Sequence, residues 1–202
     1  LADGVDAKDI FLYVIGKYTP SLAQYRSLEW KGPAIDAMSM DGRFTLACHS
    51  IELGAKCAPF EPDEKCLQYV RATPRANEPF DPTPADQDAT YEATYVEDVS
   101  RLAPQVALPH GFDVIKPVTE VEGAHVDQCN LGSCANGRLD DLAMVARIVK
   151  GRKLKARLIF SPATTRTYKR AVQAGVVETL LDAGVMIVAP SCITCGGQGA
   201  CI

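Results

Sequence analysis

The clearest structural pattern in the sequence begins with DQCNLGSCANGRLDDLAMVARIV, residues 127–149. It begins with a short run, Asp127–Leu131, that we predict to be a strand, and after a glycine-containing turn it continues as a helix over Leu139–Val149. The elements that we predict after it are a strand at Ala156–Phe160, helices at Thr165–Ala174 and Val176–Ala183, and a strand at Val185–Val188. Strands and helices that alternate at this spacing predict an α/β fold, with a parallel sheet and right-handed crossover helices.

Three cysteines follow the strands of this predicted sheet. Cys134 lies in a turn just past the first strand, and Cys192 and Cys195 lie in a glycine-rich loop just past the third. The carboxyl ends of parallel strands meet at one edge of a sheet, which is where such sheets bind ligands. We therefore expect the three sulfur atoms at the same edge.

Most free cysteines are small apolar core residues, and we interpret Cys57, Cys66 and Cys129 in this way. The other three differ because glycines beside them let the backbone approach a bulky ligand. Three thiolates suit a [4Fe-4S] cluster with one iron left open to water or a substrate oxygen. Cys201 is a possible fourth ligand.

Two other cysteine sites remain as alternatives. A structural zinc site usually has four ligands in local pairs, whereas one arm here has a single suitably placed cysteine. A thioredoxin-like pair opens a helix, and we expect the glycines after Cys195 to resist one.

Composition is that of an ordinary globular protein, with 47% hydrophobic and 23% charged residues among 202. The net charge of −4 and the lack of a basic run argue against nucleic acid as a partner.

The sequence has neither an apolar stretch of about 20 residues, which a membrane span needs, nor a secretory signal. Eight cysteines are too few for a disulfide framework, so we expect a reducing, cytoplasmic compartment. Both ends look cut, so we expect an internal piece of a longer protein.

The first half of the chain is predicted to be mainly helical. Asp6 would cap a helix over Ala7–Ile15 that Gly16 ends, and Asp63–Ala72 would form another. Between them a mixed segment, Ser39–Ala47, leads into His49–Lys56, which has a small-residue face. Further along we predict a proline-rich linker at Thr73–Ala85 and strands at Tyr91–Val99 and Val106–Leu108. The domains that we expect are 1–73, a linker or crossing segment at 74–117, and an α/β domain at 118–202.

These residues resemble the aconitase superfamily over nearly the whole chain. Gly132 to Arg138 with Asp140-Asp141-Leu142 is close to the family's Gly-Ser-Cys-Thr-Asn-Gly-Arg and Glu-Asp-Leu. Its Cys-x-x-Cys-x-Gly-Gln is present from Cys192 to Gln198. Upstream matches are Ser39 to Arg43, Ile51 to Lys56, Pro62 to Glu64 and Val118 to Gly123. The resemblance implies aconitase-like three-layer domains and a large subunit of the 3-isopropylmalate dehydratase or homoaconitase type.

The resemblance also implies roles for individual residues. Cys134, Cys192 and Cys195 would hold the [4Fe-4S] cluster, and Glu52 would be an active-site glutamate rather than an exposed helix carboxylate. Departures from the family that matter for the site are at three positions. Cys48 stands where relatives carry an asparagine near the cluster, His49 replaces a methionine, and Ala135 replaces a threonine.

The activity that the resemblance implies is that of a hydro-lyase acting on a hydroxy di- or tricarboxylate. We expect 3-isopropylmalate dehydration first, and homoaconitase or aconitase activity as alternatives. A small subunit carrying the swivelling domain would be the partner, and the substrate-binding arginines and the serine base would lie outside this chain. This chain alone would then be inactive. A non-catalytic metal-binding or RNA-binding module is the alternative of another class, and the acidic balance disfavours it.

Overall fold

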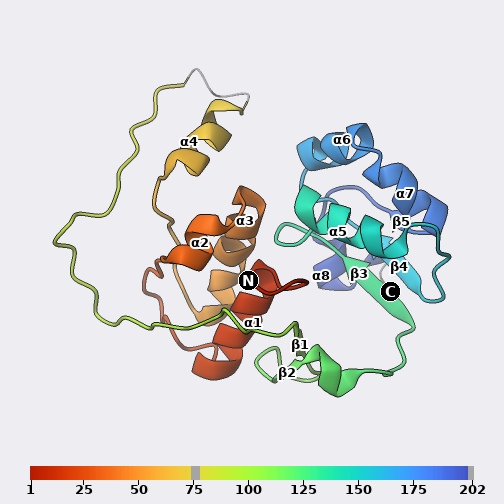
Figure 1. Ribbon diagram of the computed structural model, residues 1–202, viewed down its shortest axis with the longest axis horizontal. Helices are drawn as coiled ribbons and strands as arrows, with labels where there is room; N and C mark the ends of the chain where they lie inside the picture. Colours follow the sequence, from red (N-terminus) through yellow and green to blue (C-terminus); the bar gives the residue numbers. More distant parts are fainter. Residues whose placement is uncertain (74–77, 200–202) are drawn as a thin grey trace. The chain divides into compact units, whose positions relative to one another are not determined.

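The computed structural model describes residues 1–73 and 78–199 and divides the chain into two compact units, Leu1–Glu120 and Val121–Ile202 (Figure 1). The second unit contains β3 (Gln128–Leu131), α5 (Leu139–Val149), β4 (Arg157–Phe160), α6 (Thr165–Gln173), α7 (Val176–Ala183), β5 (Met186–Ile187) and α8 (Ile193–Gly196). Its three strands form one parallel sheet in the order β3-β4-β5. The predicted α/β alternation is therefore confirmed.

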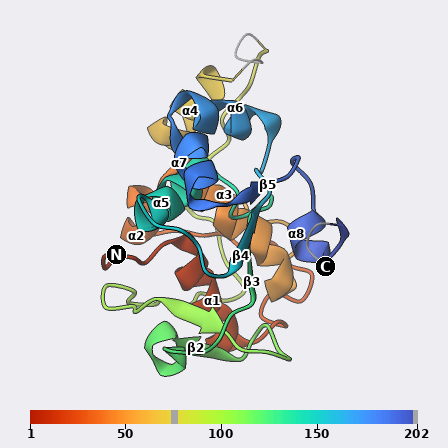
Figure 2. The same ribbon diagram turned by 90° about the vertical axis from the view of Figure 1, so that its right-hand side faces the viewer.

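The core of this unit lies between the sheet and the helices α5, α6 and α7. Leu142 on α5, Leu180 on α7 and Phe160 on β4 are fully buried there. Figure 2 shows α5 and α7 on the same side of the strands. The helices begin and end where the sequence provides caps. For example, the Asp141 carboxylate accepts from the Arg138 backbone N–H at 2.9 Å, and Gly184 ends α7 in the left-handed conformation.

The interpretation of Cys57, Cys66 and Cys129 as core residues is wrong. Cys129 is exposed at the start of β3, which lies at the edge of the sheet formed by the described strands, beside β4. Cys57 is also exposed and lies 3.3 Å from the Ser27 hydroxyl, while Cys66 is half-buried on a surface helix. Burial in these cases is decided by neighbouring elements rather than by the apolar character of the thiol.

The first unit packs around α1 (Ala7–Tyr18). Its other elements are α2 (Pro33–Ala37), α3 (Met40–His49), the 3-10 helix η1 (Ser50–Leu53), α4 (Glu64–Arg71), β1 (Gln105–Ala107), β2 (Ile115–Pro117) and η2 (Val118–Val121), which crosses the boundary. Ile15, Leu46 and Leu53 are fully buried in its core. Asp6 caps α1 as predicted, because its carboxylate accepts from the Lys8 N–H at 2.7 Å.

Gly16 does not end α1, contrary to the prediction. The helix continues to Tyr18 and stops at Thr19, whose φ is 67°. A Cβ atom at Gly16 would lie 2.8 Å from the Ile115 side chain. The glycine therefore serves the close approach of β2 to α1 and is not a helix stop.

The predicted strand at Tyr91–Val99 is also wrong. This segment is extended but has no ladder partner among the described residues, and most of its side chains are exposed. Side-chain bonds fix it instead. Glu97 accepts from Tyr13 and Lys17 of α1, each at 2.7 Å, and also from Tyr18. The predicted strand at Val106–Leu108 is present as β1, which pairs antiparallel with β2.

In the two described ranges of the chain, no helix is both long and apolar enough to cross a membrane.

Candidate functional site

The turn after β3 presents Cys134 and is held against the end of β4. The Ser161 N–H at the end of β4 donates to the Leu131 carbonyl at 2.9 Å. A Cβ atom at Gly132 would overlap the Ser161 carbonyl oxygen, and one at Gly137 would lie 2.5 Å from it. Glycine is therefore required at both positions, because the turn passes directly over the β4 backbone.

Ser161 also fixes the loop that follows β5. Its hydroxyl lies 3.1 Å from the Ala189 carbonyl, 3.1 Å from the Ser191 carbonyl and 3.2 Å from the Ser191 N–H, which donates to it. The side chain is fully buried. One serine thus joins the two loops that carry the candidate ligands. It was not singled out from the sequence, although its position at the carboxyl end of a buried strand is a signal that could have found it.

Cys192 and Cys195 lie at the one-turn helix α8. The Cys195 N–H donates to the Cys192 carbonyl at 3.1 Å, and Gly197 ends the turn in the left-handed conformation. The glycines were expected to resist a helix here, and the helix has one turn only, with Gly196 as its last residue and Gly197 as its cap. The helix is only four residues long, unlike the long helix of a thioredoxin-like site.

The two cysteine-bearing loops meet. Ser133, the residue before Cys134, lies with its hydroxyl 3.4 Å from the Cys195 sulfur. Cys134, Cys192 and Cys195 are all free thiols with exposed side chains. Parallel strands with glycine-containing turns thus bring the two loops to one edge of the sheet, with thiols that a ligand can reach.

In residues 1–73 and 78–199, no three His, Cys, Asp or Glu side chains converge on a single metal ion. A zinc ion needs its ligands around one centre. A four-iron cluster differs because each cysteine binds a separate iron at its own corner. Three free, exposed thiols on two adjoining loops fit that donor set. Cys201, the possible fourth ligand, lies outside the described residues.

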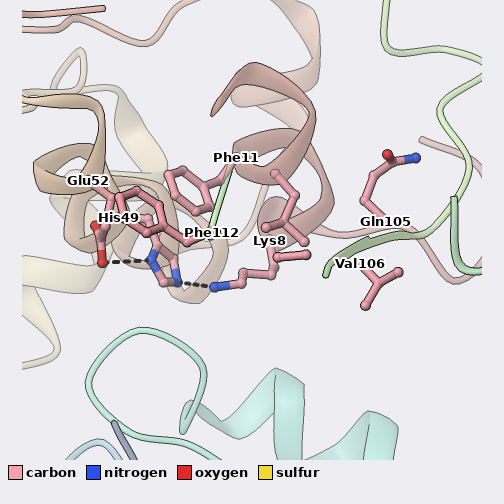
Figure 3. Close-up of a pocket in the computed structure, with 9 residues that line it drawn as sticks. Lys8, Phe11, His49, Glu52, Gln105, Val106 and Phe112 are labelled. Atoms are coloured by element: carbon pink, nitrogen blue, oxygen red, sulfur yellow. Dashed lines mark hydrogen bonds and ion pairs between the residues drawn. The ribbon is translucent and has the colours of Figure 1, made fainter. Parts of the chain in front are cut away.

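Glu52 lies in the first unit, on η1, at a cavity of about 380 Å³ (Figure 3). The cavity is also lined by residues of α1, of α3 and of the segment around β1, among them Lys8, Phe11, His49, Gln105 and Phe112. Glu52 Oε1 lies 3.4 Å from His49 Nδ1, and its Oε2 is buried without a hydrogen-bond partner among the described residues. Lys8 Nζ lies 2.9 Å from His49 Nε2. Lys8 was not singled out from the sequence, because a lysine on a capped helix gives no signal of a contact with a distant histidine.

The helix α3, which ends at His49, is fixed by an ion pair between a buried arginine and a half-buried aspartate. Arg43 is 3% exposed and binds both oxygens of Asp63, at 2.9 and 2.5 Å. Hydrogen bonds from the Arg43 guanidinium lower the pKa of Asp63 to about 2. Since Asp63 also caps α4, the pair ties α3 to the next helix.

Ala135 is buried beside Cys134, at 8% exposure. The departure from the threonine of the resembled family therefore places a methyl group, rather than a hydroxyl, inside this turn. Cys48, the other cysteine that departs from the family, is half-buried at the end of α3.

Curated proteins that the chain is similar to are named large subunits. It is 45% identical over 193 residues to a probable methanogen homoaconitase large subunit of Methanosarcina mazei, covering 96% of this chain and 49% of the relative. It is 44% identical over 195 residues to the 3-isopropylmalate dehydratase large subunit of Oleidesulfovibrio alaskensis, covering 96% and 46%. A probable 3-isopropylmalate dehydratase large subunit of Methanothermobacter thermautotrophicus is 43% identical over 199 residues, covering 98% and 47%.

The chain thus spans about half the length of the curated relatives it matches. The family model described as the aconitase family (aconitate hydratase) matches residues 1–201. That match covers both units, from the pocket of Glu52 to the cysteine loops. The chain belongs to the aconitase family.

Proposed function

We propose that this chain is the cluster-binding part of an iron–sulfur hydro-lyase that reversibly dehydrates a hydroxy di- or tricarboxylate, with 3-isopropylmalate as the first candidate substrate. The observation that carries the proposal is the 3.4 Å contact between Ser133 Oγ and Cys195 Sγ, which joins the two loops bearing free thiols. The names of the relatives support the choice of reaction, since two of the three are 3-isopropylmalate dehydratase large subunits.

Cys134, Cys192 and Cys195 would bind a [4Fe-4S] cluster as thiolates. When bound, such a cluster supplies a Lewis-acidic iron that carries no protein thiolate. The protein's part is to hold the three sulfur atoms in fixed positions. Ser161 supports this role because its buried hydroxyl contacts the loop before Cys192 while its backbone holds the turn before Cys134.

Glu52 is the residue that we propose for proton transfer or for binding the reacting hydroxyl group. Its side chain lines the cavity, and its buried Oε2 oxygen has no hydrogen-bond partner among the described residues, so the carboxylate keeps an acceptor that the described part of the chain does not use. A carboxylate can accept a proton, and the carboxylic acid that forms can return it. The base that acts at the adjacent carbon would come from elsewhere in the complete enzyme.

The partner that we propose is a small subunit, because all three relatives are named large subunits. The test is to assemble the full-length large subunit with its small subunit, reconstitute it anaerobically with iron and sulfide, and follow dehydration of 3-isopropylmalate, homocitrate and citrate. We expect turnover of 3-isopropylmalate that disappears in Cys134→Ser and persists in Cys129→Ser, whose exposed thiol lies in β3. Failure of the reconstituted wild type to turn over any of the three acids would refute the proposal.

Homoaconitase activity is the second candidate. The relative from Methanosarcina mazei carries that name and is 45% identical to this chain. The same assay separates the two, because preferential turnover of homocitrate would favour this candidate.

A further inference from the structure

Lys8, His49 and Glu52 form a chain of polar contacts across the first unit's cavity (Figure 3). Lys8 Nζ lies 2.9 Å from His49 Nε2, and His49 Nδ1 lies 3.4 Å from Glu52 Oε1. Lys8 comes from the first turn of α1, whereas His49 and Glu52 stand three residues apart at the end of α3 and on η1. Side chains of α1 and α3 therefore both contribute to the position of the Glu52 carboxylate on η1.

The hydrogen-bonding capacity of the three groups fixes the position of the imidazole proton. A lysine ammonium has three donors and no acceptor, so His49 Nε2 must be the acceptor of the 2.9 Å bond. A neutral imidazole carries its proton on the other nitrogen, which here is Nδ1 and faces Glu52. His49 is thereby oriented to donate to the carboxylate.

The ring of His49 has little freedom to move. Phe11 stacks on it, with the ring centroids 4.5 Å apart and an angle of 16° between the planes. The side chain is 14% exposed, and the Lys8 ammonium also lies over the Phe11 ring, 5.3 Å from its centroid. Stacking on one face and polar contacts at both nitrogens hold the imidazole in a single orientation.

We propose that His49, oriented by Lys8, is a positioning residue that holds the Glu52 carboxylate through Oε1 at the wall of the cavity. Oε1 is the oxygen near His49, while Oε2 has no partner among the described residues. The inference rests on the proposed function, in which Glu52 binds or protonates the reacting hydroxyl. It adds that the carboxylate depends on a histidine at a position where the resembled family has a methionine.

The test compares His49→Leu, His49→Gln and Lys8→Met in the full-length, cluster-loaded protein. Leucine removes both hydrogen-bonding functions, whereas the glutamine amide can accept from Lys8 and donate to Glu52. We expect His49→Leu to lower kcat by about 10- to 100-fold, because the carboxylate is no longer held in place. His49→Gln should recover most of that loss, with iron content unchanged in each variant. His125→Leu, which alters an exposed histidine of the second unit, is the matched control.

Equal kcat in His49→Leu and wild type would overturn the proposal, as would equal losses in His49→Leu and His49→Gln. A second measurement needs no activity. In cluster-free, full-length protein labelled with 15N-histidine, the nitrogen shifts should show the proton of His49 on Nδ1, and Lys8→Met should change that pattern. A proton on Nε2 in the wild type would overturn the proposal. If the wild type dehydrates no substrate, the proposed function fails, and the nitrogen shifts still decide the tautomer.

Discussion

Replacing Ser161 by alanine tests how the two cysteine-bearing loops are held together. The hydroxyl of Ser161 is fully buried and lies within 3.2 Å of three backbone atoms in the loop after β5. Its removal leaves the Ser191 N–H and one of the carbonyls without this partner. An unsatisfied buried group costs about 1–3 kcal/mol. We therefore expect the free energy of unfolding of the second unit to fall by about 2 kcal/mol.

The larger consequence should be for the cluster. A change of one or two kcal/mol is a factor of roughly 5 to 30 in an equilibrium, so loosened loops should release the cluster about fivefold faster or more. The assay is urea denaturation of the cluster-free chain, together with the decay in air of the cluster's visible absorbance. Val177→Ala is the matched control. It removes two buried carbon atoms from α7 at a cost of about 2 kcal/mol and leaves the loops intact.

Two results would show that Ser161 does not hold the two loops together. One is that the Ser161→Ala variant unfolds at the same urea concentration as the wild type and keeps its cluster as long as the wild type does. The other is that the Val177→Ala variant loses its cluster as fast as the Ser161→Ala variant. Cluster loss would then depend on the overall stability of the second unit rather than on the loop contacts.

Three further changes should show how the fold supports the site. Gly132→Ala should destabilise the second unit by about 2–4 kcal/mol in urea denaturation, since φ is +122° and a Cβ would overlap the Ser161 carbonyl; wild-type stability would contradict the close approach. Gly16→Ala should lower the free energy of unfolding by about 1–3 kcal/mol, because its Cβ atom would clash with the Ile115 side chain. Adding Ile115→Ala should remove part of this clash, so strictly additive losses in the double variant would count against the close approach. In the folded chain the pKa of Asp63 is about 2, below its ordinary 3.8, so the ion pair stabilises the fold above pH 4 and this stabilisation is lost as the pH falls toward 2. Asp63→Asn should make the free energy of unfolding depend less on pH in that range. An unchanged pH dependence would disprove the ion pair's role.

The parallel α/β unit could be predicted from the sequence because local patterns and global packing agree in it. The helix at Leu139–Val149 has the predicted bounds, since its cap and its apolar spacing both lie within the segment. The sheet edge follows from the alternation of strands and helices, and with it the meeting of the two cysteine loops. The assignment of Cys134, Cys192 and Cys195 as cluster ligands stays a prediction.

Other features depend on contacts between segments far apart in the sequence. Gly16 is typical of a helix end, yet its role is set by Ile115, which lies almost one hundred residues later. A strand is predicted at Tyr91–Val99, but side-chain bonds to α1 and to other parts of the first unit hold it as an extended segment. The contact of Lys8 with His49 likewise joins two helices, and neither helix alone predicts it.

The proposed cluster site consists of three thiols on two adjoining loops. Its occupancy can be measured as iron and acid-labile sulfide per chain after anaerobic reconstitution of the wild type, Cys134→Ser and Cys129→Ser. We predict about four irons per chain for the wild type and for Cys129→Ser, and loss of the stable cluster in Cys134→Ser. A Cys134→Ser chain that retains a full cluster as tightly as the wild type would contradict the account.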